Sequence, residues 1–292
     1  MKIQTECVPC LLRRIIFESE QSTSDKEKKT KTIKKACKTL SELYDPNKCS
    51  AVIATKVHKI VYDTLEDSDP YINLKNQANF YAKKLLPRIE NTVKNSDDPL
   101  KTSIISSIVG NMMDFGIPGA SKDPKSLVEI FEKTVSEKLG NDDYDKIDNL
   151  LSKSKKVLFF TDNCGEIVFD KILCKELKKK YPDIYLTLVV KGESVLSDAT
   201  MKDALELGFN EVVDKILTTG CFAVGVDFDK MPKELKNSLE ESDLIICKGM
   251  ANYESFSETS YRPICYLMRV KCSAIARSIG VKQNTSIIKL FS

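Results

Sequence analysis

Histidine and tryptophan are the scarcest residues in this chain of 292 residues, which has one histidine, His58, and no tryptophan. A histidine-based zinc hydrolase needs two or three imidazoles, and a Ser-His-Asp or Cys-His arrangement would have to use His58. That residue lies in a strongly helical pattern, which favours a structural role. Any chemistry here must therefore rely mainly on carboxylates, amides, lysines or thiols.

Long apolar runs and glycine-rich nucleotide loops are also missing. The apolar runs at 157–160 and 186–190 are far too short to cross a bilayer, and the N-terminus lacks the apolar stretch of a signal peptide. We therefore expect a cytoplasmic protein with no membrane partner. Neither GxGxxG after the first expected strand nor GxxxxGK[ST] anywhere is present, which argues against dinucleotide binding and P-loop hydrolysis.

Charge gives no evidence for a nucleic-acid partner. The net charge is +3, and the lysine-rich segment 26–35 is interrupted by Glu27 and has apolar residues at helical spacing nearby. These features favour a solvated helix face. No aromatic residues are interleaved with the lysines for single-strand binding.

The ten cysteines are expected to be reduced thiols, because no secretory signal accompanies them. Cys7 and Cys10 form a lone CxxC pair with no second pair at the spacing of a zinc knuckle. A structural or redox thiol site and simple packing at a helix start are both consistent with this pair.

The hydrophobic pattern changes near residue 150. Before it, three- and four-residue spacing predicts an all-helical domain over 1–150, with helices at 10–20, 24–44, 49–64, 74–94, 99–113 and 124–139. After it, β-branched runs predict strands in an α/β domain over 151–292, at 157–160, 185–190, 211–217, 243–247, 264–268 and 286–291. Helices expected at 166–180, 200–207, 233–240 and 273–278 separate most of these strands. Such alternation predicts a mostly parallel sheet covered on both faces.

Polar residues follow several of these strands, at the edge where parallel sheets bind ligands. The first strand leads into Asp162 and Asn163, and the second into a loop that carries Asp198. Each acid could be a helix N-cap, but together with the amide they form an all-oxygen set suited to Mg²⁺ or Mn²⁺. Lys248 and Lys271 follow two further strands and add positive charge to the same edge.

Three segments carry a resemblance to a known family: TDNCGEIVFD (161–170), KGESVLSDATMKDA (191–204) and CKGMANYESFSE (247–258). Together with GNMMDFG (110–116), the tripeptide at 69–71 and the ECVPC opening, they resemble the damage-control phosphatases, also called domain-of-unknown-function family 89. The CxxC pair resembles one branch of that family.

The resemblance implies a Rossmann-like α/β/α domain preceded by a helical domain. It also implies metal-dependent removal of phosphate from small phosphorylated metabolites, such as sugar phosphates or damaged phosphometabolites, with Mn, Mg, Co or Ni as the divalent ion. The implied metal ligands are Asp162, Asn163 and Asp198. The implied pocket residues are Asn111, Asp114, Glu166, Lys248, Asn252 and Lys271. The family usually has Asn where this chain has Ser197.

The hypothesis that follows is that Asp162 or Glu166 orients or deprotonates a water while Lys248 and Lys271 neutralise charge. A covalent aspartyl-phosphate on Asp162 stays open. Two rival hypotheses are a carboxyl methyltransferase and a non-enzymatic metal- or redox-binding module that uses Cys7 and Cys10. The sequence leaves the oligomeric state open.

Overall fold

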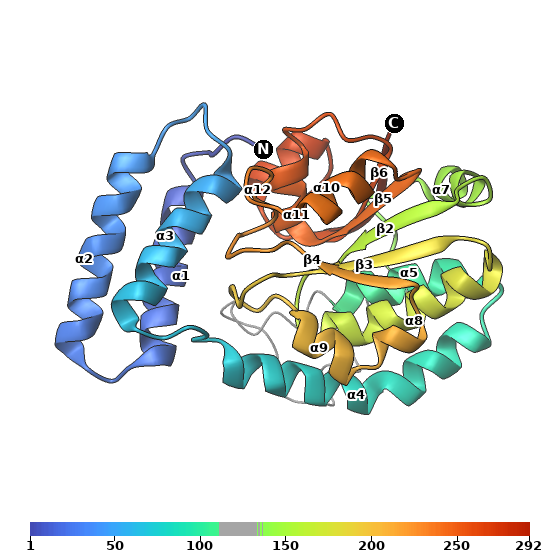
Figure 1. Cartoon of the computed structure of the whole chain (residues 1–292), viewed down its shortest axis with the longest axis horizontal. Helices are drawn as coiled ribbons and strands as arrows, with labels where there is room; N and C mark the ends of the chain where they lie inside the picture. The colour runs from blue at the N-terminus through green and yellow to red at the C-terminus, as the bar shows by residue number, and fades with distance from the viewer. Residues whose placement is uncertain (111–132, 134, 136) are drawn as a thin grey trace.

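A computed structural model of the chain describes residues 1–110, 133, 135 and 137–292. Helices α1 to α3 form a bundle beside a layered α/β body (Figure 1). The helices of the first half are α1 (Cys7–Ser22), α2 (Lys26–Leu43), α3 (Ser50–Leu65), α4 (Ile72–Lys94) and α5 (Pro99–Gly110). Those of the second half are α7 (Tyr144–Leu151), α8 (Glu166–Lys180), α9 (Met201–Glu206), α10 (Lys233–Glu240), α11 (Gly249–Phe256) and α12 (Ser273–Ile279). No helix in the described ranges is both long and apolar enough to span a membrane.

The α/β body contains a seven-stranded sheet in the order β1-β7-β6-β5-β2-β3-β4. Its strands are β1 (Asn141–Asp142), β2 (Lys156–Phe160), β3 (Tyr185–Val190), β4 (Lys215–Thr218), β5 (Leu244–Lys248), β6 (Ile264–Val270) and β7 (Thr285–Phe291). Among the strand pairs of the described residues, only β6–β7 is antiparallel. The predicted mostly parallel α/β sheet is therefore confirmed.

The strand prediction differs from the structure in two places. The short strand β1 was not predicted. The strand expected at 211–217 begins only at Lys215, because the preceding residues form a 3-10 helix, Phe209–Glu211. There the N–H groups of Val212 and Val213 both donate to the carbonyl of Phe209 and cannot join the sheet.

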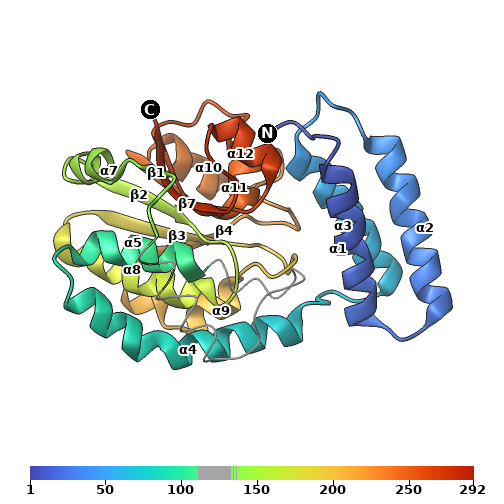
Figure 2. The same cartoon turned by 180° about the vertical axis from the view of Figure 1, so that it is seen from behind.

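The central strands are buried on both faces. In β2, Val157 and Phe159 pack into one hydrophobic core while Leu158 and Phe160 pack into another. Successive side chains of a strand point to opposite faces, so both faces of the sheet must be covered. Helices α4, α5, α8 and α9 contribute to the first core, and α10, α11 and α12 to the second. Figure 2 shows the long helix α4 running along the outside of this first layer.

The helices α1 to α3 have a core of their own, which includes Ile15, Leu40 and Val57. Val195 and Phe222, from loops that follow β3 and β4, belong to the same core. The bundle therefore packs against the carboxyl end of the sheet. The boundary at residue 150 stays a prediction, although α4 and α5 precede it and share a core with the sheet. Most of the helix predicted at 124–139 lies outside the described residues.

Candidate functional site

The loops after β2 and β3 are joined at the carboxyl edge of the sheet. Asn163 and Asp198 form an isolated antiparallel bridge, and the N–H of Ala199 donates to the carbonyl of Asp162 at 2.8 Å. β2 and β3 are neighbouring parallel strands, so both loops leave the same edge. The structure thus brings together the three residues predicted as metal ligands, and all three are buried.

Hydrogen bonds fix the orientation of the Asn163 amide. Its nitrogen donates to Asp162 Oδ2 at 2.7 Å and to Glu166 Oε2 at 3.2 Å. Its oxygen accepts from the hydroxyl of Ser197 at 2.6 Å. Ser197 is the position where the sequence departs from the family pattern, and its hydroxyl here holds the amide oxygen directly. That oxygen retains a second lone pair for a further partner.

Helix α11 begins in direct contact with Asp162. Its first residue, Gly249, has a φ of 75°, and a Cβ atom built there would lie 1.9 Å from Asp162 Oδ2. Glycine is required for both reasons, since it adopts positive φ without strain and leaves room for the carboxylate. The N-terminus of α11 therefore lies against Asp162.

A fully buried ionic network lies behind the three predicted metal ligands. The ammonium group of Lys248 donates to Glu166, to Asp170 Oδ1 at 2.7 Å and to the carbonyl of Ser107 at 3.1 Å. A lysine ammonium has three donors, so these acceptors use all of them. Lys248 was predicted to contact substrate, whereas here it holds two carboxylates. The sequence reasoning did not single out Asp170, although an acid four residues after Glu166 lies on the same face of a helix.

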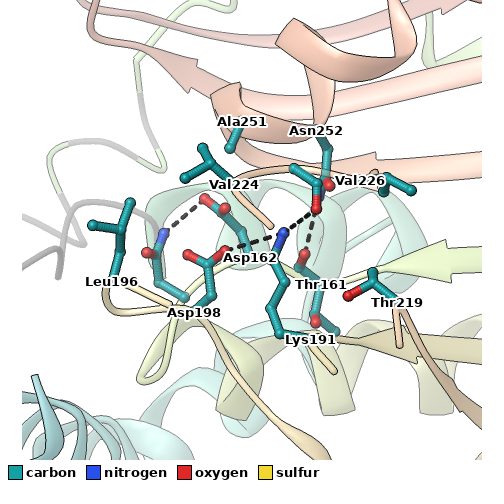
Figure 3. Close-up of polar contacts among 12 residues, drawn as sticks. Thr161, Asp162, Lys191, Leu196, Asp198, Thr219, Val224, Val226, Ala251 and Asn252 are labelled. Atoms are coloured by element: carbon teal, nitrogen blue, oxygen red, sulfur yellow. Dashed lines mark hydrogen bonds and ion pairs between the residues drawn. The ribbon is translucent and has the colours of Figure 1, made fainter. Parts of the chain in front are cut away.

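A second buried lysine, Lys191, forms an ion pair with Asp198 (Figure 3). Its Nζ atom is 3.3 Å from Asp198 Oδ2 and donates to the carbonyl of Gly225 at 2.5 Å. The side chain is 3% exposed. Lys191 was missed as a site residue, although the sequence places a lysine directly after the strand that leads to Asp198.

Burial and like charges shift the titration of the acids in this region. Burial, followed by the charges of Asp198 and Glu166, raises the pKa of Asp162 well above its usual value. Burial also raises the pKa of Asp170 to about 6, against the opposing effect of Lys248. Burial alone would lower the pKa of Lys248, but Asp170 and Glu166 raise it above its ordinary value. Buried carboxylates are costly unless a cation compensates them.

When all of its groups are ionised, the buried cluster carries more negative than positive charge. Four buried carboxylates face two ammonium groups, which leaves a net charge of −2; the residues are Asp162, Glu166, Asp170, Asp198, Lys191 and Lys248. Across the part of the chain that the structure describes, no three His, Cys, Asp or Glu side chains converge as a metal site. The candidate site instead has two carboxylates and an amide. This donor set fits a hard divalent ion that keeps several waters, as Mg²⁺ does.

The remaining predicted pocket residues are placed differently. Asn252 is buried, and its amide nitrogen donates to the carbonyls of Thr161 at 3.0 Å and Lys248 at 2.7 Å, so it ties β2 to α11. Lys271 directly follows β6, which is separated from β2 by β5. It lies at the same edge of the sheet but two strands away. Asn111 and Asp114 lie outside the described residues.

The two thiols of the CxxC pair lie in the first turn of α1. All ten cysteines are free, and burial raises the pKa of Cys7 to about 11, with Cys10 among the smaller contributors. The adjacent Glu6 accepts hydrogen bonds from Ser273 at 2.8 Å and Arg277 at 2.5 Å, which dock this end of α1 on α12. The thiol site stays a prediction.

The single histidine is distant in sequence from the candidate ligands and is buried between helices. His58 Nδ1 lies 2.8 Å from a carboxylate oxygen of Glu18. The side chains of both residues are at most 2% exposed. This pairing explains how a polar imidazole is accommodated inside the helical bundle.

The doubly wound sheet and the acid and amide groups at its carboxyl edge define a class of α/β protein that binds its ligand at the strand ends. Residues 3–287 match the family model described as the damage-control phosphatase ARMT1-like domain. The chain therefore belongs to the damage-control phosphatase family, and it is a phosphatase. The family resemblance seen in the sequence motifs is confirmed.

Three other proteins are similar to this chain over nearly its whole length. A damage-control phosphatase of Archaeoglobus fulgidus is 39% identical over 99% of both chains. An uncharacterized protein of Methanocaldococcus jannaschii is 33% identical over 99% of this chain and 95% of that protein. The crystal structure of a protein of domain-of-unknown-function family 89 from Pyrococcus horikoshii matches with a TM-score of 0.91 at 27% identity, and the match covers all of both chains.

Proposed function

We propose that this phosphatase is metal-dependent and hydrolyses phosphate monoesters of small metabolites, such as sugar phosphates or damaged phosphometabolites. The observation that carries the metal dependence is that four buried carboxylates share only two ammonium groups in this cluster. Asp162, Asn163 and Asp198 would hold the ion through oxygen atoms, and Mn²⁺, Mg²⁺, Co²⁺ and Ni²⁺ are the candidates. When bound, a divalent ion would polarise the phosphoryl group and lower the pKa of water.

Two helix N-termini support phosphate binding at the same place. Helix α8 begins at Glu166, after the short loop that follows β2, and α11 begins directly after β5. The N-cap residue of neither helix makes a side-chain cap hydrogen bond. Their N–H groups and dipoles favour an anion. The phosphoryl group of a substrate would bind near these helix starts, beside Asp162.

In the proposed reaction a water oxygen attacks phosphorus as the bond from phosphorus to the ester oxygen breaks. The water gives up a proton, the leaving alkoxide takes one, and the products are an alcohol and inorganic phosphate. We assign the acceptance of the water proton to the carboxylate of Asp162, which lies at the tip of β2. Glu166 is fully buried and binds Lys248 and Asn163, so we assign it to holding the Asn163 amide in place.

Turnover by metal-stripped protein tests this proposal. The substrates would be p-nitrophenyl phosphate and a panel of sugar phosphates, with Mg²⁺, Mn²⁺, Co²⁺ or Ni²⁺ added back. We expect each active metal to restore turnover in the wild type and none to restore it in Asp162→Ala. Full activity in the chelated protein, or in the variant, would exclude the proposed site. The ranking of the sugar phosphates would also define the substrate class.

A further inference from the structure

Of the two buried lysines at the site, Lys248 has no donor left for a substrate. Its three N–H donors are matched by Glu166, Asp170 and the carbonyl of Ser107. A phosphate oxygen could bind this lysine only by displacing one of these partners. Displacement would leave a buried carboxylate or carbonyl unpaired, which is costly.

Lys191 has fewer hydrogen-bond acceptors around its ammonium group than Lys248 has. In the described part of the chain, its Nζ atom has two acceptors within bonding distance, Asp198 Oδ2 at 3.3 Å and the carbonyl of Gly225 at 2.5 Å. One of its three donors is therefore left over. The longer contact, to Asp198, is also longer than a normal charged hydrogen bond.

The position of Lys191 suits a phosphoryl group. It pairs with one predicted metal ligand, Asp198, and its positive charge opposes the rise in the pKa of the other carboxylate, Asp162, that burial causes. In Figure 3 its ammonium group lies between Asp198 and Asn252, with Val224 and Val226 drawn nearby. Few waters can screen a charge that is 3% exposed, so its attraction for an anion is strong there.

We propose that Lys191, and not Lys248, is the cation that contacts the phosphoryl group and stabilises the negative charge that develops during hydrolysis. Lys248 then acts as a positioning residue, because it holds Glu166 and, through it, Asn163. This inference rests on the proposed function. It makes Lys191 a catalytic residue that was not among the sequence-predicted site residues.

The test compares Lys191→Met with the wild type by calorimetry, using Mn²⁺ alone and then inorganic phosphate added to the Mn²⁺-loaded protein, together with kcat on p-nitrophenyl phosphate. Removing a positive charge from beside Asp198 should leave Mn²⁺ affinity unchanged or raise it. Phosphate affinity should fall about tenfold or more, and kcat roughly 100-fold. A loss of phosphate affinity while Mn²⁺ affinity is kept or raised cannot arise from a general loss of structure.

Three further variants sharpen the test. Lys191→Gln keeps an N–H donor for the Gly225 carbonyl and replaces Lys191→Met if that protein does not fold. Lys191→Arg retains the charge and should recover part of the phosphate affinity. Lys215→Met is the matched control, since Lys215 lies at the start of β4 and pairs with Glu234 at 2.6 Å. It should behave as the wild type.

Two outcomes would overturn the proposed role of Lys191 but leave the proposed function standing. One is unchanged phosphate affinity in the Met and Gln variants. The other is a parallel loss of Mn²⁺ and phosphate binding, which would mean that Lys191 only holds Asp198. A wild type that binds Mn²⁺ but neither binds phosphate nor turns over ester would overturn the proposed function and this inference together. That failure is visible without any variant.

Discussion

Asn79 on α4 is hydrogen-bonded to Gly165 in the loop after β2, where its amide oxygen accepts from the glycine N–H at 2.7 Å. The amide nitrogen of the same side chain donates to Asp203 Oδ1 at 3.0 Å. Asp203 in turn forms the capping box of α9 with Thr200. Thr200 lies two residues after Asp198 in the chain. One side chain on a covering helix therefore links both loops of the candidate site.

Replacing Asn79 should impair the site more than the fold. Asn79→Ala removes both hydrogen bonds and lets the two loops separate, so we expect kcat/KM to fall roughly 10- to 100-fold. The free energy of unfolding should fall by about 1–2 kcal/mol. Steady-state kinetics and urea unfolding measure the two effects. The exposed Asn76, one turn earlier on α4, provides the control, and equal behaviour of Asn79→Ala and Asn76→Ala would contradict this link.

The contact between α11 and Asp162 can be tested with a pair of glycines. Gly249 and Gly280 both have positive φ, 75° and 80°, but a Cβ atom on Gly280 would meet nothing within 4 Å. Gly280→Ala should therefore cost only the conformational strain, about 1–2 kcal/mol. Gly249→Ala should cost more, because its methyl group displaces the Asp162 carboxylate.

Urea unfolding and Mn²⁺ calorimetry distinguish the two variants. We expect Gly280→Ala to bind Mn²⁺ as the wild type does, and Gly249→Ala to bind it weakly or not at all. Normal Mn²⁺ binding by Gly249→Ala would show that α11 does not define the position of Asp162.

Much of the fold was readable from the sequence because local patterns determine it. The runs that became β2, β3, β5, β6 and β7 are apolar and β-branched, as strands buried on both faces must be. β1 has two residues and no apolar pattern, so nothing local marks it. Its pairing depends on β7, which is far along the chain.

The site was predictable only to the level of residue type. Acids and an amide after strands predicted Asp162, Asn163 and Asp198 as metal ligands, and the structure places these three residues together. The two lysines could not be told apart, because both follow a strand and both are followed by glycine. Their difference arises from packing: α5 brings the Ser107 carbonyl, and α8 brings two acids, to Lys248. Periodicity does not specify which covering helix meets which strand end.

The buried network should be essential to folding. Lys248→Met leaves Glu166 and Asp170 without their cation, and breaking a buried pair in this way costs about 3–5 kcal/mol. Lys156 provides the comparison, because it pairs with Glu241 at the similar distance of 2.7 Å but both side chains are more than half exposed. Lys156→Met should have little effect on the free energy of unfolding, because exposed ion pairs contribute little to stability. Chemical unfolding of both variants gives the answer, and similar costs would argue against the network.

The thiols of α1 should differ in reactivity. The thiolate is the nucleophile, and the pKa of Cys7 is raised to about 11. Its rate of alkylation by iodoacetamide should therefore keep rising up to about pH 11, and it should be low near pH 7. Cys10 is exposed and should react first. Mass spectrometry of digests, with Cys10→Ser as the matched variant, locates the label. Rapid labelling of Cys7 at pH 7 would instead support a redox role for this pair.

Stoichiometric binding of Mn²⁺ shows directly whether Asp162 and Asp198 hold a metal ion. Asp162→Asn and Asp198→Asn each remove one negative charge while keeping the shape of the side chain, and electron paramagnetic resonance counts the free ion independently of turnover. We expect one tightly bound Mn²⁺ per wild-type chain and none in either variant at the same concentration. Undiminished binding in both variants would place the metal elsewhere and contradict the proposed metal site.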